Sequence, residues 1–166
     1  MANRPIAVLL DLDGTAVDVR PVRHYVAGAN RNFDKFHRAS AYCPPNPAVL
    51  TLAHRCVELG LRIVVMTGRS ETYRALSAAW LEKHAVEYDV LLMRAAGDYR
   101  ADRVVKEELL REVLQTYDVA LAIDDNPGII DLWRSKGIQV VEVPGFDDDY
   151  TESVETPIPV RDPFGG

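Results

Sequence analysis

Ile6-Ala-Val-Leu-Leu-Asp-Leu-Asp-Gly-Thr15 is the stretch that decides the fold of this chain. A run of apolar residues leads directly into two carboxylates, Asp11 and Asp13. Such a run predicts a buried strand, and ligands bind at the C-terminal ends of strands in open parallel sheets. Two carboxylates held close together repel each other unless a cation lies between them. The stretch therefore indicates a divalent metal and a metal-assisted reaction.

The composition is that of an ordinary globular domain. The 166 residues are 48% hydrophobic and 27% charged, which suits one domain with one core. A net charge of −6 argues against a protein that coats long nucleic acid through bulk charge. No apolar run reaches the roughly 18–20 residues of a membrane span, and the acidic start does not suit a signal peptide. Cys43 and Cys56 lack CxxC spacing and are expected to be free thiols, which favours a cytoplasmic location.

Strand-like and helix-like segments alternate along the chain. Helix signals are clear at Asn46-Pro47, which can cap and start a helix, and at Gly60, which can end it. The patterns predict strands over 6–11, 61–66, 88–93, 119–123 and 138–143, and helices over 46–59, 70–84, 102–117 and 127–136. This alternation predicts a doubly wound, Rossmann-like α/β fold, in which a parallel sheet has helices on both faces.

Two segments interrupt the alternation. Residues 16–45 show no single period and exceed an ordinary loop in length, so they predict a small flap or cap inserted after the first strand. Residues 151–166 contain three prolines and a terminal Gly pair, which predicts an extended or disordered tail. We therefore expect a single domain over 1–150. The GxxxxGK[ST] pattern is absent, so we expect no P-loop kinase in this chain.

Polar side chains follow three of the predicted strands and should converge on one edge of the sheet. With a lysine on the helix between the third and fourth strands, these residues are Asp11, Asp13, Thr67, Arg69, Lys106, Asp124 and Asp125. Carboxylates can hold Mg²⁺, and cations can neutralise a phosphate and its transferring oxygens. The set therefore indicates phosphoryl transfer.

The two acids of the first strand can divide the chemistry. Asp11, ionised beside a metal, can attack phosphorus and form an aspartyl-phosphate. Asp13 can protonate the leaving oxygen and then take a proton from the hydrolytic water. Gly14 permits the sharp exit of the backbone, and Thr15 can donate a hydrogen bond to phosphate or to Asp11.

These motifs resemble those of a known superfamily. In chain order, Asp11-Leu-Asp-Gly-Thr15, Thr67, Lys106 and Asp124-Asp125 resemble the four motifs of the haloacid dehalogenase superfamily. Within it, the chain is similar to the 3′-phosphatase domain of the bacteriophage polynucleotide kinase–phosphatases over about residues 6–147. Three strings carry that narrower likeness: Ile63-Val-Val-Met-Thr-Gly-Arg69, Gly97-Asp-Tyr-Arg-Ala-Asp-Arg-Val-Val-Lys-Glu-Glu108, and Ala122-Ile-Asp-Asp-Asn126 with Trp133 and Gly137 after it.

The resemblance implies a metal site and a catalytic pair. It implies that Asp11 is the nucleophile and a Mg²⁺ ligand, and that Asp13 is the acid/base with its backbone carbonyl on the metal. Lys106 would bridge the phosphate and Asp11. Asp124 and Asp125 would complete the metal site, and we favour Asp125 as the direct ligand because some relatives carry Gly-Asp there.

The resemblance also implies a phosphate and substrate site. Thr67, with the backbone that follows it at Gly68, would bind the phosphate. Arg69 resembles the family arginine that contacts substrate. The insert is longer than the loop of the family, so the flap arginine of the family has no unique match. Arg31 is our first choice, with Arg20 and Arg23 as alternatives.

The predicted function is a Mg²⁺-dependent phosphomonoesterase that removes 3′-phosphate from polynucleotide or nucleotide ends. A phosphorylated nucleic-acid end or nucleotide would be the substrate, and a separate kinase or ligase a partner. Basic residues within 16–38 would guide a phosphodiester backbone, or else form a solvated loop. One alternative is a phosphatase of free nucleotides or small metabolites. Another, of a different class, is a catalytically silent module that only recognises phosphate.

Overall fold

The computed structural model describes residues 3–145 and 157–165. In this part of the chain, parallel strands form one five-stranded sheet in the order β3-β2-β1-β4-β5. The strands are β1 (Ile6–Leu10), β2 (Arg62–Ser70), β3 (Val90–Arg94), β4 (Asp118–Asp124) and β5 (Gln139–Glu142). The helices are α1 (Phe33–Ser40), α2 (Pro47–Glu58), α3 (Arg74–Lys83), α4 (Asp102–Val113) and α5 (Pro127–Ser135), with short 3-10 turns η1 (Arg23–Tyr25) and η2 (Glu71–Tyr73).

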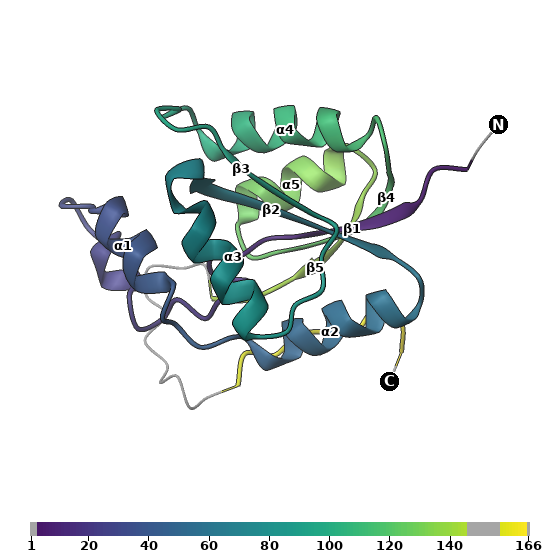
Figure 1. The fold of residues 1–166 in the computed structure, drawn as a ribbon, viewed down its shortest axis with the longest axis horizontal. Coiled ribbons are helices and arrows are strands. Elements are labelled where there is room, and N and C mark those ends of the chain that lie inside the picture. Colours follow the sequence, from purple (N-terminus) through teal and green to yellow (C-terminus); the bar gives the residue numbers. More distant parts are fainter. Residues whose placement is uncertain (1–2, 146–156, 166) are drawn as a thin grey trace.

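The predicted doubly wound α/β fold is confirmed. Helices α2 and α3 pack on one face of the sheet, and α4 and α5 pack on the other (Figure 1). From β1 the chain first builds outward through β2 and β3, and it then returns to place β4 on the other side of β1. This reversal is a topological switch point, so the C-terminal ends of β1 and β4 border the crevice where such sheets bind ligands.

The central strand is buried on both faces. Ala7 and Leu9 pack into the core formed with α4 and α5, whereas Val8 and Leu10 pack into the core formed with α2 and α3. None of the four side chains is more than 2% exposed. This double burial explains why the strand reads as an unbroken apolar run rather than an alternating one.

The insert after β1 packs against the body of the domain. It contains η1 and α1, and its buried apolar residues join the core on the α2 and α3 face. The indole Nε1 of Trp80 on α3 donates a 2.9 Å hydrogen bond to the carbonyl of Cys43 near the end of the insert. The insert is therefore held at its C-terminal end by the same core that holds the sheet.

Several boundaries differ from the sequence-based prediction. Strand β2 continues past Met66 to Ser70, because Thr67 pairs with Met93 and Ser70 pairs with Arg94 across a register shift. The predicted helix over 70–84 is divided into η2 and α3. The predicted free thiols are confirmed, since both cysteines are buried and unbridged. No helix in the described ranges is long and apolar enough to cross a bilayer.

The described end of the chain lies against α2. The predicted tail begins at 151, and its first residues, 151–156, lie outside the described residues. From 157 to 165 the chain has no helix or strand, yet Ile158 is only 7% exposed and joins the core on the α2 face. The Arg55 guanidinium of α2 lies 2.7 Å from the Asp162 carboxylate. This segment therefore contributes to the packing of the domain.

The packing of Ile158 leads to a test of stability. Ile158→Ala should lower the free energy of unfolding by about 2–4 kcal/mol, because it removes buried methyl groups and leaves a cavity beneath the chain end. Urea unfolding followed by circular dichroism measures the change. Arg161→Ala, at an exposed neighbouring position, is the control and should change stability little. Equal stability of the two variants would show that the contact contributes nothing.

Candidate active site

Three carboxylates meet at the switch point of the sheet. Asp11 directly follows β1, Asp124 ends β4, and Asp125 is the next residue. Strands β1 and β4 are paired in parallel, and the backbone N–H of Asp11 donates to the carbonyl of Ile123 at 3.2 Å. The carboxylates of the three aspartates are buried, and each offers an oxygen within 4.8 Å of the others. We call Asp11, Asp124 and Asp125 the carboxylate cluster.

Lys106 supplies the positive charge of the cluster. It lies on α4, only 1% exposed, and its Nζ donates to Asp11 Oδ1 at 3.0 Å and to Asp124 Oδ2 at 3.1 Å. Burial disfavours the charged ammonium, but the attraction of the two carboxylates is stronger and raises the pKa of Lys106 above its ordinary value. Lys106 is therefore charged at neutral pH and links α4 to both central strands.

Asp124 is the most firmly held member of the cluster. Its Oδ2 accepts from Lys106 and, at 3.2 Å, from the indole Nε1 of Trp133, and its Oδ1 accepts from the backbone N–H of Asn126 at 3.1 Å. Trp133 is buried in the core of the α4 and α5 face, and it also orients this carboxylate.

Asp125 approaches the loop that follows β1. The Thr15 hydroxyl, fully buried, lies 3.0 Å from Asp125 Oδ1 and 3.3 Å from Asp11 Oδ2, so it bridges the two. Gly14 has a φ of +82°, and a Cβ built there would lie 2.1 Å from Asp125 Oδ2. Glycine is therefore required at position 14 by both backbone conformation and space.

The cluster carries more negative than positive charge. Burial raises the pKa of Asp11 well above its ordinary value, and the neighbouring carboxylates add to this against the attraction of Lys106. Burial, together with repulsion by Asp124, raises the pKa of Asp125 to about 7. Converging carboxylate oxygens that resist ionisation are the donor set that a divalent cation satisfies. The residues present thus fit a metal ion, and carboxylate oxygens suit hard divalent cations as a class.

Asp13 belongs to a second group of polar side chains. Its Oδ2 accepts from Arg69 Nε at 2.8 Å, and its Oδ1 accepts from Arg69 Nη2 at 2.5 Å. Burial alone would raise the pKa of Asp13, but the Arg69 guanidinium outweighs burial and holds that pKa well below its usual range. The structure therefore separates the carboxyl of Asp13 from the carboxylate cluster, although Asp11 is only two residues away.

The surroundings of Arg69 differ from those expected for a substrate contact. Arg69 is 1% exposed, and besides Asp13 its guanidinium donates to Ser77 Oγ and Ser40 Oγ, each at 3.0 Å. All three guanidinium nitrogens thus donate to protein side chains. This arrangement gives Arg69 the task of holding Asp13, and the contact between Arg69 and substrate stays a prediction.

Thr67 and Gly68 lie at the C-terminal end of β2, beside the end of β1. Thr67 is 1% exposed, and its Oγ1 accepts from the backbone N–H of Arg69 at 3.2 Å. A Cβ at Gly68 would lie 2.3 Å from Asp102 Oδ1, at the start of α4. Both residues are thus at the edge of the sheet where phosphate binding was predicted.

The candidate flap arginines have different surroundings. Arg31, the first choice from the sequence, is exposed and donates to the carbonyl of Gly28 at 3.4 Å. Arg20 is bound to Asp18, with its Nε 2.8 Å from Asp18 Oδ1. The charge of the alternative Arg23 helps to lower the pKa of Asp125, so its field reaches the carboxylate cluster. The choice of flap arginine among Arg31, Arg20 and Arg23 stays a prediction.

Sequence reasoning missed His37 and Ser40, both on α1. His37 Nδ1 lies 3.4 Å from Asp13 Oδ2, and Ser40 holds Arg69. The two are three residues apart, so they lie on one face of the helix. This i, i+3 spacing is the signal in the sequence from which a shared position on one helix face could have been predicted.

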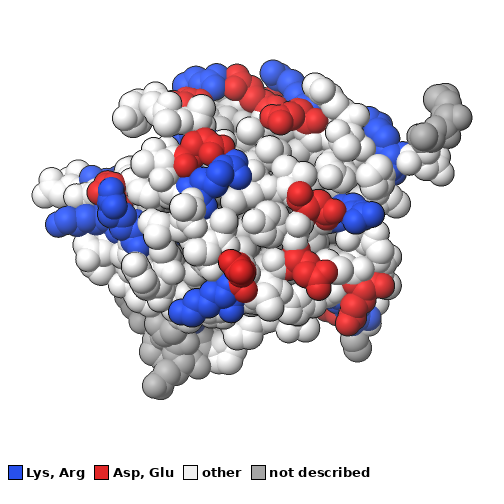
Figure 2. All heavy atoms as spheres, in the orientation of Figure 1, with Lys and Arg blue, Asp and Glu red and all other residues white. Residues whose placement is uncertain are grey.

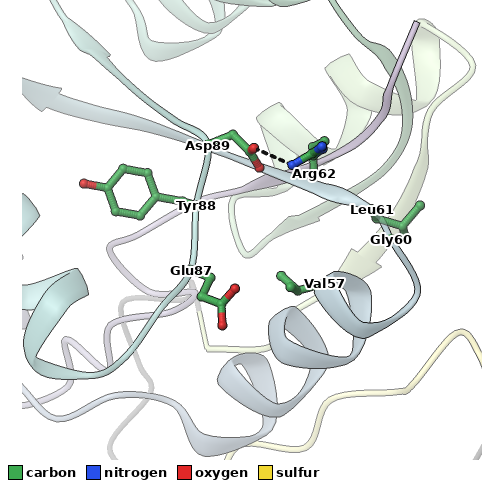
Figure 3. A pocket seen from close by; sticks show the side chains of 7 residues that line it. All are labelled: Val57, Gly60, Leu61, Arg62, Glu87, Tyr88 and Asp89. Carbon is green, nitrogen blue, oxygen red and sulfur yellow. Dashed lines mark hydrogen bonds and ion pairs between the residues drawn. The ribbon is translucent and has the colours of Figure 1, made fainter. Parts of the chain in front are cut away.

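A cavity lies away from these residues. It measures about 310 Å³ and is lined by the end of α2, the start of β2 and the segment before β3. In Figure 3, Arg62 and Asp89 face each other across an ion pair, while the ring of Tyr88 points away. The cavity is therefore at the N-terminal edge of the sheet, opposite the carboxylate cluster.

Comparison with known proteins identifies the family. A family model of the phosphatase domain of the polynucleotide kinase PNKP matches residues 5–147. The chain belongs to this family. The sequence-based assignment to phosphatases of the haloacid dehalogenase type is thereby confirmed.

Solved structures agree with the family assignment. A chain in a structure of the Pnkp1/Rnl/Hen1 complex is 28% identical, with a TM-score of 0.73 over 89% of this phosphatase domain. A chain in a structure of the Pnkp1/Rnl/Hen1 RNA repair complex is 29% identical, with a TM-score of 0.75 over 87%. This phosphatase domain spans 48% and 44% of those two chains, about half their length.

A more distant likeness shows the fold alone. The class C acid phosphatase from Bacillus anthracis, solved with tungstate bound, is 17% identical, with a TM-score of 0.67. The match covers 92% of this domain and 76% of that chain.

The raised pKa of Asp125 makes stability depend on pH. In the unfolded chain this carboxyl ionises near its ordinary value of roughly 4, whereas in the metal-free fold it holds its proton up to about 7. Its contribution to stability is therefore complete below about pH 4 and is lost as the pH rises through about 7. We expect the Tm measured in EDTA to fall from about pH 5 to about pH 8.

Two controls accompany this measurement. Asp125→Asn cannot ionise at this position, so its Tm should fall less over the same pH range. Added Mg²⁺ should raise the Tm most at the higher pH, because the carboxylates of the cluster are then ionised and repel one another most strongly. If the Tm of the variant and that of the wild type depend on pH in the same way, ionisation of Asp125 is not the cause of the pH dependence.

Proposed function

We propose that this domain is a Mg²⁺-dependent phosphomonoesterase that acts through an aspartyl-phosphate and removes 3′-phosphate from nucleic-acid ends. The observation that carries the proposal is the separation of two neighbouring acids. Asp11 lies in the carboxylate cluster, 3.0 Å from Lys106, whereas Asp13 is held apart by Arg69. The two carboxyls therefore have different surroundings and can take different chemical tasks. A metal ion held beside Asp11 would favour the ionised form that a nucleophile needs.

Asp11 would act as the nucleophile. One of its oxygens would attack phosphorus while the bond from phosphorus to the leaving oxygen breaks, and the leaving oxygen would take a proton from Asp13. Lys106 would offset the negative charge that phosphate brings to Asp11. Water would then attack the aspartyl-phosphate and give its proton to Asp13, which restores both acids and releases inorganic phosphate.

The ionisation state of Asp13 is compatible with these two reaction steps. Paired with Arg69, Asp13 is ionised, which is the form required to accept a proton from water in the second step. Phosphate brings negative charge toward Asp13 when it binds, and nearby negative charge favours the protonated form of a carboxyl. Substrate binding thus supports the protonated form needed for the first step.

Asp11, Asp124 and Asp125 would hold the metal ion. When bound, Mg²⁺ would supply positive charge to the phosphate oxygens and offset the repulsion among the carboxylates. Asp125 is the better candidate for a direct ligand, because both oxygens of Asp124 already accept hydrogen bonds from the protein. Asp124 would then orient its neighbours, as the sequence-based choice between them anticipated.

Several features support a nucleic-acid substrate. The matched family is that of the PNKP phosphatase domain, and one similar chain comes from a structure of the Pnkp1/Rnl/Hen1 RNA repair complex. Lys and Arg side chains gather over α1 in Figure 2, and the rings of Phe33 and Tyr42 in the insert are exposed. Exposed rings and cations are suited to bases and phosphates of a single strand. A separate kinase or ligase partner and a cytoplasmic location are also part of this proposal.

Asp11→Asn tests the chemistry. The amide cannot act as a nucleophile, so kcat should fall at least about 10³-fold. The Tm must be compared with that of the wild type, because Asp11 also binds Lys106. Mg²⁺-dependent turnover at the wild-type rate would sink the assignment of the nucleophile.

The substrate itself is tested by a panel. Values of kcat/KM for a 3′-phosphorylated oligonucleotide, a 5′-phosphorylated oligonucleotide, a 3′-nucleoside monophosphate and a sugar phosphate should be highest for the first. A preference for the sugar phosphate would favour the alternative of a metabolite phosphatase. Binding of phosphate without turnover of any ester would favour the silent module.

The flap arginine can be identified by comparing variants. Arg23→Ala should lower kcat/KM for the 3′-phosphorylated oligonucleotide about 10-fold or more, and more than for a small aryl phosphate, because it removes a charge beside the cluster. Arg31→Ala should have the smaller effect. Arg111→Ala, at the far end of α4, is the matched control and should have none. A larger loss for Arg31→Ala would restore the choice made from the sequence.

A further inference from the structure

The insert helix α1 reaches the proposed acid/base directly. Two of its residues, His37 and Ser40, contact different members of one polar group. His37 Nδ1 lies 3.4 Å from Asp13 Oδ2, and Ser40 Oγ accepts from Arg69 Nη2 at 3.0 Å. Arg69 in turn binds both oxygens of Asp13. The position of Asp13 is therefore defined by β2 through Arg69 and by the insert through His37.

The His37 ring is fixed by its neighbours. Its centroid lies 5.3 Å from that of Phe36 in an edge-to-face contact and 5.2 Å from that of Tyr73 on η2. Nδ1 is buried and faces the Asp13 carboxylate at 3.4 Å. A buried polar atom needs a polar partner, and the Asp13 carboxylate is placed to serve as that partner.

Contacts on the outer side of α1 tie the helix to η2. The Tyr73 hydroxyl donates to Asp34, and Arg38 Nε donates to the same carboxylate at 3.1 Å. The Arg38 guanidinium also lies over the Tyr73 ring, 5.9 Å from its centroid. These exposed contacts dock α1 on the segment that follows β2. A shift of α1 would therefore displace His37 from Asp13.

We propose that His37 is a positioning residue that holds the Asp13 carboxyl where it can protonate the leaving oxygen, so that leaving-group departure depends on a docked α1. This inference rests on the proposed function. Proton transfer needs donor and acceptor within about 2.6–3.2 Å, so a small displacement of Asp13 removes much of the benefit. His37 touches Asp13 and is not required to touch the reacting atoms.

A leaving-group series separates positioning from a merely structural role. Esters of acidic phenols, such as p-nitrophenyl phosphate, depart without a proton, whereas alkyl phosphates and 3′-phosphorylated oligonucleotides need one. With enzyme in excess, His37→Ala should slow release of the alcohol about 10–100-fold for alkyl esters and less than about 3-fold for p-nitrophenyl phosphate. The plot of log rate against the pKa of the leaving group should become steeper.

Three comparisons make the experiment decisive. His37→Asn places an amide N–H near the position of Nδ1 and should restore most of the alkyl-ester rate, and it serves if His37→Ala folds poorly. His24→Ala, at an exposed histidine in the same insert, should behave as the wild type. A loss by His37→Ala that is equal for all leaving groups, or no loss, would overturn the inference. A wild type inactive on every ester would overturn the proposed function as well.

Discussion

The rest of the structure depends on one electrostatic constraint, which is the burial of three carboxylates around a single ammonium. Like charges at this separation cannot all be ionised in a dry site without compensation, and Lys106 supplies only one positive charge for three potential negative ones. The pairing of β1 with β4 brings the acids together, and α4 is positioned so that Lys106 lies beside them. The fold therefore places a site that lacks positive charge at its switch point. A bound cation can supply that charge and can in turn bind a phosphate.

The domain separates two acids that the sequence places almost side by side. The chain turns directly after β1, where the carbonyl of Leu12 accepts from the backbone N–H of Thr15 at 3.0 Å, and Asp11 and Asp13 reach different partners. One group of partners comes from α4 and β4, the other from β2 and the insert. The ionisation of each acid is thus set by a different part of the fold, which allows one to attack phosphorus while the other moves protons.

Much of this could be predicted from the sequence. The sheet and its flanking helices follow from apolar runs that alternate with capped helical segments, and the meeting of Asp11 with Asp124 and Asp125 follows from parallel strands ending at one edge. The insert could not be predicted in the same way, because it has no single period and its path is set by contacts with the body. For that reason His37 and Ser40 were missed, and the sequence could not distinguish the candidate flap arginines. The motif that contains Arg69 likewise could not show that its guanidinium binds Asp13, Ser40 and Ser77.

The contact between Gly14 and Asp125 has a consequence for how this site can change over time. Any side chain at position 14 would meet the Asp125 carboxylate, so a substitution there requires that carboxylate to move or to be replaced. Positions 14 and 125 are far apart in the sequence, yet they are expected to change together in evolution. A lineage that had replaced both residues would need two mutations to restore the pair.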